Sequence, residues 1–141
     1  MKKTILAAAV ATILLTQISA HALTLTVKGL GTSSANGKYL CLLFNSAVGF
    51  PKEPAKAYKS VTGTVAGNTG SCIFPGVPAG TYAVSTFHDK NSDEKLNTGM
   101  FGIPQEKYGF SNNASEPFGP PSFQKAAFKL TADYVLQINL K

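Results

Sequence analysis

KYLCLLF, residues 38–44, is apolar on both faces and therefore predicts a central β-strand. Upstream, LTLTVK at residues 23–28 alternates apolar and polar residues, which is typical of a strand with one buried face. Further strands are predicted at residues 57–66, 71–74, 81–88, 126–130 and 134–140, separated by turn residues. No long helical period interrupts them. We therefore expect an all-β fold, a seven-stranded antiparallel β-sandwich.

The first 22 residues predict a secretory signal peptide. A basic start with two lysines precedes an apolar run at residues 5–18, and Ala20-His-Ala22 fits a small-x-small cleavage site. The apolar run is shorter than the roughly 20 residues that a membrane-spanning helix needs. No other stretch is as long, so we expect no transmembrane segment in the mature chain. We expect a periplasmic or secreted bacterial protein with a single domain at residues 23–141.

The basic residues do not indicate a nucleic-acid partner. Removal of Lys2 and Lys3 leaves 11 of the 13 basic residues against 7 acidic ones, a net charge of +4, and none of them is Arg. Nucleic-acid and phosphate sites usually depend on Arg side chains. The lysines are also scattered along the chain. We expect a soluble basic surface, with at most weak and unspecific attraction to anionic lipid or polysaccharide.

Cys41 and Cys72 predict a structural disulfide. An even pair of cysteines in an oxidising compartment is typical of a bridge, and neither residue belongs to a CxxC motif. Closing a loop of about 31 residues contributes roughly 3.5–4 kcal/mol in the chain-entropy model. A metal-binding or redox pair is the alternative.

Residues 89–121 lack the alternation of strands and turns that is predicted for the remainder of the mature chain. Such a long stretch without a strand is uncommon unless it is functional or carries structure of its own. We expect an ordered loop packed on the sandwich, with a single helical turn at residues 104–109. It is either a decorated crossover between sheets or a binding surface. Its four aromatic residues are Phe101, Tyr108, Phe110 and Phe118.

The start of this segment predicts a weak calcium loop. With Asp89 at position 1, hard oxygen donors recur with the spacing of an EF-hand loop. They are Asn91 at position 3, Asp93 at position 5, the Lys95 carbonyl at position 7 and Asn97 at position 9. The last carboxylate would come from Glu106 or Glu94. The expected Kd is on the order of 10⁻⁴–10⁻³ M.

The alternative is a plain turn rich in Asp and Asn, since these residues are turn formers. The EF-hand pattern is incomplete, because Glu94 replaces Gly at position 6 and Met100 replaces Glu at position 12. Zinc and copper are not expected, because the mature chain has one His and no CxxC pair.

Two adjacent stretches carry a family resemblance. FPGVPAGTYAVSTFHDKNSDEKLN and GMFGIPQEKYGFSNNASEPFGPPSFQKAAFKL cover residues 74–97 and 99–130. They resemble the bacterial exported family catalogued as domain of unknown function 2141. The shared pattern is a Gly-Thr-Tyr strand, then His-Asp-x-Asn, then Gly-x-Pro-x-Glu-x-Tyr-Gly-Phe-Ser-Asn-Asn.

The resemblance implies a seven-stranded sandwich of the prealbumin/transthyretin or carboxypeptidase-regulatory type. It implies no activity, since the family is named for lacking one. Members of the family tend to have Gly where this chain has Glu94, so the tight turn after Asp93 is the point of departure.

We predict a non-catalytic exported binding module that uses residues 89–113 to bind a partner protein or glycan. Calcium would order the loop. Tyr108 and Phe110 would supply apolar contact area, and Asn112 and Asn113 would supply hydrogen bonds.

The alternative is a small hydrolase-like enzyme centred on His88, Asp89 and Glu106. His88 is the sole His of the mature chain. Ser85, Ser92 and Ser111 lie nearby in the sequence, but no Gly-x-Ser-x-Gly motif or other nucleophile signature accompanies them.

Overall fold

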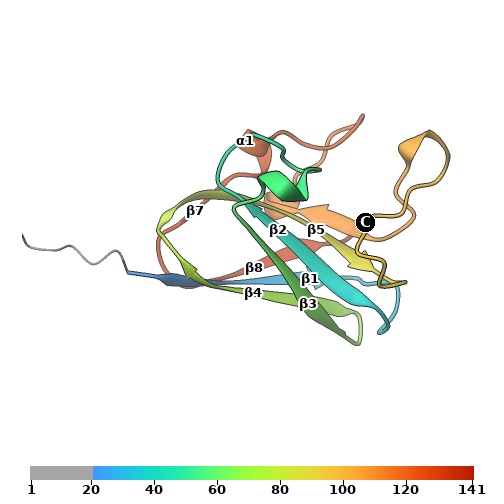
Figure 1. The fold of residues 1–141 in the computed structure, drawn as a ribbon, viewed down its shortest axis with the longest axis horizontal. Coiled ribbons are helices and arrows are strands. Elements are labelled where there is room, and N and C mark those ends of the chain that lie inside the picture. The colour runs from blue at the N-terminus through green and yellow to red at the C-terminus, as the bar shows by residue number, and fades with distance from the viewer. Residues whose placement is uncertain (1–20) are drawn as a thin grey trace, which may run out of the picture.

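The computed structural model describes residues 21–141, so the predicted signal peptide at residues 1–22 lies outside the described residues except for its last two. Eight strands dominate the described chain (Figure 1). They are β1 (Leu23–Leu30), β2 (Lys38–Phe44), β3 (Lys59–Ala66), β4 (Thr69–Val77), β5 (Gly80–Asp89), β6 (Tyr108–Phe110), β7 (Phe128–Leu130) and β8 (Tyr134–Asn139). The helices are the 3₁₀ turns η1 (Pro54–Lys56), η2 (Met100–Gly102) and η3 (Ser111–Asn113), and α1 (Phe123–Ala126).

The strands form a mixed sheet in the order β6-β5-β2-β3-β4-β1-β8, with β7 paired to β5. The all-β prediction is confirmed. The seven-stranded antiparallel sandwich is wrong, because there are eight strands and β8 runs parallel to β1. The helical turn predicted at residues 104–109 is also wrong. Its last residues belong to β6, because Tyr108 and Gly109 pair with Phe87 and Thr86 of β5.

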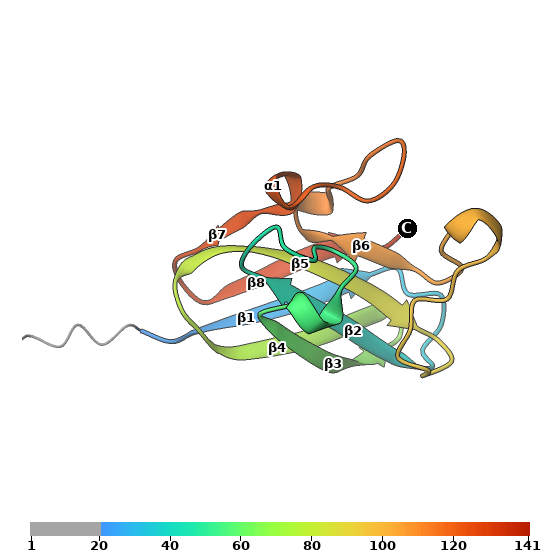
Figure 2. The same ribbon diagram turned by 45° about the horizontal axis from the view of Figure 1, so that its top comes forward.

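The sheet is nearly closed into a barrel. β3 connects the part of the sheet that contains β2 with the part that contains β4. Its residues 59–63 pair with β2, and its residues 64–66 pair with β4. At the opposite seam, Tyr108 of β6 and Lys141 exchange two backbone hydrogen bonds, with N–O distances of 3.2 and 3.0 Å. Figure 2 shows the C-terminal end of the chain beside β6. The seam therefore joins β6 to the chain end that follows β8.

The predicted disulfide is confirmed at the sharp bend of this barrel. Cys41 on β2 and Cys72 on β4 are bonded, although β3 lies between their strands in the sheet. Their Cα atoms are 6.5 Å apart. Flat strands separated by a third strand would lie roughly 9.5 Å apart, so the sheet folds tightly here. Gly63 of β3 sits at the bend, where a Cβ would overlap the Ser71 carbonyl.

The barrel interior holds the main core, and Tyr39 lies at its centre. The ring is fully buried against Gly29 of β1 and Gly70 of β4, which pair with each other. A Cβ at either glycine would overlap the ring. Within the described residues, the Tyr39 hydroxyl is buried and has no hydrogen-bond partner.

Burial raises the pKa of the Tyr39 hydroxyl above its ordinary value of 10.0. A raised folded-state pKa leaves the free energy of unfolding intact below about pH 10 and lowers it as the pH rises further. Tyr39→Phe removes a hydroxyl without a partner. We expect equal or higher stability at neutral pH and a smaller alkaline loss.

Thermal melts at neutral pH and just above about pH 10 measure both effects of this substitution. The control is Tyr134→Phe, since Tyr134 is 48% exposed on β8. An alkaline loss as large in Tyr39→Phe as in the wild type would contradict the assignment.

A second, smaller apolar cluster covers one end of the outer face of β2 and β5. Phe50 is its centre, with ring centroids 5.3 Å from Phe44, 6.1 Å from Phe110 and 5.9 Å from Phe123 of α1. Ser122 caps α1 by accepting a hydrogen bond from the Lys125 backbone N–H at 3.3 Å. The cluster leaves the remainder of this outer face uncovered.

Candidate functional site

The uncovered part of the outer face is the floor of an open groove. Leu42 of β2 is opposite Ser85 of β5, and Phe87 of β5 is opposite Tyr108 of β6. Their neighbours along each strand point into the barrel, so these side chains point outward. A cavity of about 890 Å³ lies over them. Its floor is therefore apolar sheet surface without a covering element.

Two loops form the walls of the groove. Residues 94–104, which include η2, line one side, and residues 116–120 line the other. Figure 2 shows both loops projecting from the same side of the molecule. Pro51, Lys52 and Pro54 complete the lining. Thr98 and Pro104 form an isolated antiparallel bridge that closes the base of the first loop.

The lining of the groove contains more lysines than acidic residues. Its two acids already pair with lysines that do not line it, Glu94 with Lys38 at 3.3 Å and Glu116 with Lys125. The lining also contains Lys52, Lys95 and Lys141, and among residues 21–141 none of these three makes a salt bridge. The Lys141 ammonium lies 5.7 Å from the centre of the Tyr108 ring. The groove thus suits ligands that combine apolar and anionic groups.

The predicted metal ligands begin at the end of β5, and their oxygens face the backbone of their own loop. Asp89 is buried. Its Oδ1 accepts a hydrogen bond from the Asp93 N–H at 3.2 Å, and its Oδ2 accepts one from the Glu94 N–H at 2.8 Å. The Asn91 side-chain oxygen also accepts from the Asp93 N–H, at 3.3 Å. These bonds order the tight turn that follows β5.

Asp93 is the hub of the loop's side-chain hydrogen bonds. It accepts from the Asn97 amide at 2.9 Å, the Lys95 backbone N–H at 2.9 Å and the Asn91 amide at 3.1 Å. These donors, Asn97 foremost, hold the pKa of Asp93 below its ordinary value. The stabilisation is present above the ordinary Asp pKa and is lost as the pH falls through the lowered one.

Glu106 ties the two ends of the loop together. One carboxylate oxygen accepts from the Lys90 N–H at 2.9 Å, and the other accepts from the Asn97 N–H at 3.0 Å. Within the described residues, no three His, Cys, Asp or Glu side chains form a group that could hold a metal ion. A cation here would therefore depend on amide and carbonyl oxygens as well as carboxylates.

Glu94 adopts a backbone conformation that is usual for Gly. Its φ is +63°, in the left-handed region that favours glycine. Ser92 has a similar φ of +59°. The departure at position 94 therefore leaves the turn in place at some cost in backbone strain.

His88 is buried and holds the segment between β1 and β2. Its Nδ1 accepts from the Ser33 backbone N–H at 3.2 Å, and the Ser33 hydroxyl lies at the same distance. Its Nε2 lies 2.7 Å from the Asn36 carbonyl, to which it donates if Nδ1 is the acceptor. Ser33, rather than Ser85, Ser92 or Ser111, is thus the serine in contact with this ring.

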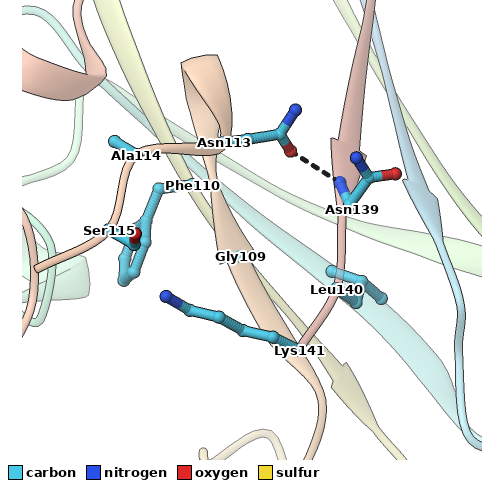
Figure 3. Close-up of a pocket in the computed structure, with 8 residues that line it drawn as sticks. All are labelled: Gly109, Phe110, Asn113, Ala114, Ser115, Asn139, Leu140 and Lys141. Carbon is cyan, nitrogen blue, oxygen red and sulfur yellow. Dashed lines mark hydrogen bonds between the residues drawn. The ribbon is translucent and has the colours of Figure 1, made fainter. Parts of the chain in front are cut away.

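Asn112 and Asn113 make hydrogen bonds within the protein. Both have positive φ, which Asn tolerates well. Asn112 donates to the Ala127 carbonyl at 2.7 Å, and Asn113 accepts from the Asn139 N–H at 2.8 Å. Figure 3 shows the second bond at a smaller cavity of about 240 Å³, between β6 and the end of β8.

The four aromatic residues of the long loop divide into two pairs. Phe110 is buried and Tyr108 is half-buried at the groove, but Phe101 and Phe118 are 93% and 95% exposed. The expectation that all four pack on the sheet is therefore wrong for Phe101 and Phe118. Sequence reasoning also missed the wall at residues 116–120 and the part of the lining at residues 51–54. The Pro- and Gly-rich composition of residues 117–121 was the available signal.

Comparison with known proteins gives one match. A family model described as an uncharacterised protein conserved in bacteria, DUF2141, matches residues 26–138. No curated protein and no solved structure matches the chain. The match includes both stretches of the sequence that carry the family resemblance.

Proposed function

We propose that this chain, which belongs to the uncharacterised bacterial family DUF2141, is an exported, non-catalytic module that binds a partner protein in the groove. The observation that carries the proposal is the cavity of about 890 Å³ over the outer face of β2, β5 and β6. Pockets of this size with apolar lining and few polar groups are typical of ligand sites.

An apolar polypeptide segment suits the groove better than a glycan. Leu42, Phe87 and Ile103 offer apolar contact area. The Thr86 hydroxyl is buried and donates to the Leu40 carbonyl at 2.7 Å, so it is not available to a ligand. A glycan would need more convergent side-chain hydrogen bonds than Ser85 and Thr98 supply.

Two observations support export and a non-catalytic role. The disulfide Cys41–Cys72 suits an oxidising compartment, as does the basic and apolar N-terminal sequence. His88 is buried and contacts Ser33 and Asn36, away from the groove lining. The residues proposed as an alternative catalytic centre thus serve as hydrogen-bonding supports of adjacent loops.

Site-specific photocrosslinking in the producing bacterium tests the binding role. A photoreactive residue replaces Ile103 in the groove wall, and the matched control replaces Val135 on β8. These side chains are 63% and 52% exposed. We expect a discrete protein adduct from position 103 alone, and its loss when Ser85→Trp fills the groove floor. Equal adducts from both positions, or an adduct that survives Ser85→Trp, would refute the groove.

We also propose that a calcium ion binds residues 89–97 and orders this loop. Support comes from the left-handed turn at Glu94 and from Asn97, whose side-chain oxygen is buried without a hydrogen-bond partner in the described chain. At about 10 mM, the calcium concentration would be about 10 to 100 times the Kd expected for this weak site. Ligand linkage then contributes roughly 1.4–2.7 kcal/mol, which raises Tm by roughly 4–16 °C.

Melts in excess chelator, calcium and magnesium measure this effect. We expect the rise with calcium alone and its loss in Glu106→Gln, which removes the charge that bridges Lys90 and Asn97. A calcium response equal to that of magnesium would leave these residues as a hydrogen-bonded turn.

A further inference from the structure

The most exposed large apolar side chains of the described chain stand at the tips of the two groove walls. Phe101 is 93% exposed and Phe118 is 95% exposed. Met100 and Ile103, beside Phe101, are 79% and 63% exposed. The φ of Phe101 is +60°, so the backbone accepts strain where it presents this ring to solvent. These side chains belong to two separate loops, which project from one side of the molecule (Figure 2).

A ligand bound in the groove does not explain why apolar side chains are exposed at the tips of both walls. Phe101 lines the cavity, whereas Phe118 does not. A ligand seated on the groove floor therefore contacts Phe101 and leaves Phe118 in water. A partner that covers both rings must be broad and must lie across the rims of the walls.

The positive charge between the two tips indicates that the partner has a negatively charged surface. Lys52, Lys95 and Lys141 line the groove without a salt bridge, and Lys38 and Lys125 neutralise its two acids. A broad surface that accepts aromatic rings and attracts ammonium groups is an anionic lipid bilayer. Its interior takes apolar side chains, and its headgroups attract lysines.

We propose that the loop tips at Phe101 and Phe118 insert into the surface of an anionic membrane, with the groove lysines at headgroup level. The protein would lie on the membrane rather than cross it. Among the helices within residues 21–141, none is long and apolar enough to span a bilayer. This inference does not depend on partner binding in the groove, because the inserted side chains are at the rims and the lysines would contact lipid headgroups rather than a protein.

Single-tryptophan reporters test each tip separately. The chain contains no Trp, so Phe101→Trp, Phe118→Trp and the control Tyr134→Trp each provide one fluorophore. Vesicles of phosphatidylethanolamine with phosphatidylglycerol are compared with vesicles of phosphatidylcholine. We expect a blue-shifted emission at positions 101 and 118 on the anionic vesicles only, and none at position 134. No shift at positions 101 and 118, or an equal shift at position 134, would overturn the proposal.

Vesicle sedimentation measures the contributions of apolar and charged groups. Phe101→Ser combined with Phe118→Ser is expected to lower vesicle binding by about tenfold or more. Lys95→Gln is expected to lower it about fivefold. The control is Lys28→Gln on the outer face of β1, for which we expect no change. Wild-type binding by the double Phe variant would overturn the insertion.

Two other partners could cover the loop tips, and each predicts a different result in these experiments. If the tips instead pack against a second copy, lipid-free protein will dimerise in sedimentation velocity, the double Phe variant will be monomeric, and vesicles will not bind. If they pack against a partner protein, vesicles will again not bind. Either result overturns the proposal, whereas a monomer that binds anionic vesicles through both tips supports it.

Discussion

Loss of the Cys41–Cys72 disulfide is expected to lower Tm by roughly 10–24 °C. The bridge spans 31 residues, and in the chain-entropy model its removal costs about 3.5–4 kcal/mol. For a domain of this size, each kcal/mol corresponds to roughly 3–6 °C. The position of the bridge adds a structural reason. It fixes β2 against β4 where β3 bends at Gly63, so its loss also loosens the bend.

Melts with and without a reductant provide the measurement, with thiol titration to establish that the bridge is open. The variant Cys41→Ala with Cys72→Ala is the matched control, because it has no bridge to reduce. We expect it to melt near the reduced wild type and to be insensitive to reductant. An unchanged Tm in the reduced wild type would refute the stabilising role.

Gly70→Ala is expected to destabilise the fold by about 3 kcal/mol, at the upper end of typical overpacking costs. The new methyl group would overlap the Tyr39 ring, which is fully buried and also bounded by Gly29 on the neighbouring strand. The ring therefore has little room to move away. The backbone at Gly70 has no positive φ, so the cost comes from the collision alone.

Chemical denaturation of four variants, Gly70→Ala, Gly80→Ala, Tyr39→Leu and Gly70→Ala with Tyr39→Leu, separates the collision from a general cost of losing glycine. Gly80→Ala on β5 is the control, because its Cβ would come no closer than 3.3 Å to the Tyr82 ring, a tight contact rather than an overlap. Combining Gly70→Ala with Tyr39→Leu should cost less than the sum of the two single changes, because the smaller side chain removes the overlap. Additive costs would count against contact between Gly70 and Tyr39.

The strands with strong local patterns could be predicted well. Residues 38–44 coincide with β2, and the regions of β1, β5 and β8 were predicted to within two residues at each end. The reason is visible in β2. Tyr39, Cys41 and Leu43 fill the barrel, while Leu42 and Phe44 face the groove and the second cluster. A strand that is apolar on both faces thus has an apolar environment on both sides.

β6 and the direction of β8 could not be predicted from local pattern. β6 has three residues, too few for a period, and depends on pairing with β5 across the long loop. Whether β8 pairs parallel or antiparallel to β1 is a property of the closed barrel. No repeat within either strand encodes it.

The candidate site shows the same division. The hydrogen-bonded loop after β5 is visible in sequence because Asp89, Asn91 and Asp93 are close together. The groove is not visible, because β2, β5 and β6 and two further loops come together only in the folded chain. The exposure of Phe118 is likewise a tertiary property, since an aromatic residue normally suggests burial.

The parallel pairing of β1 with β8 has a consequence for the rate of folding. Leu25 pairs with Tyr134, and the Asp133 carboxylate, 109 residues from Thr24, accepts a hydrogen bond from the Thr24 N–H. Contacts between such distant residues form late and slowly, because the chain entropy of closing the loop is lost before they can form. β1 can pair with β4 earlier, but its second edge stays unpaired until nearly the whole domain has been made. We therefore expect the barrel to close only after residues 134–139 are available to pair with β1.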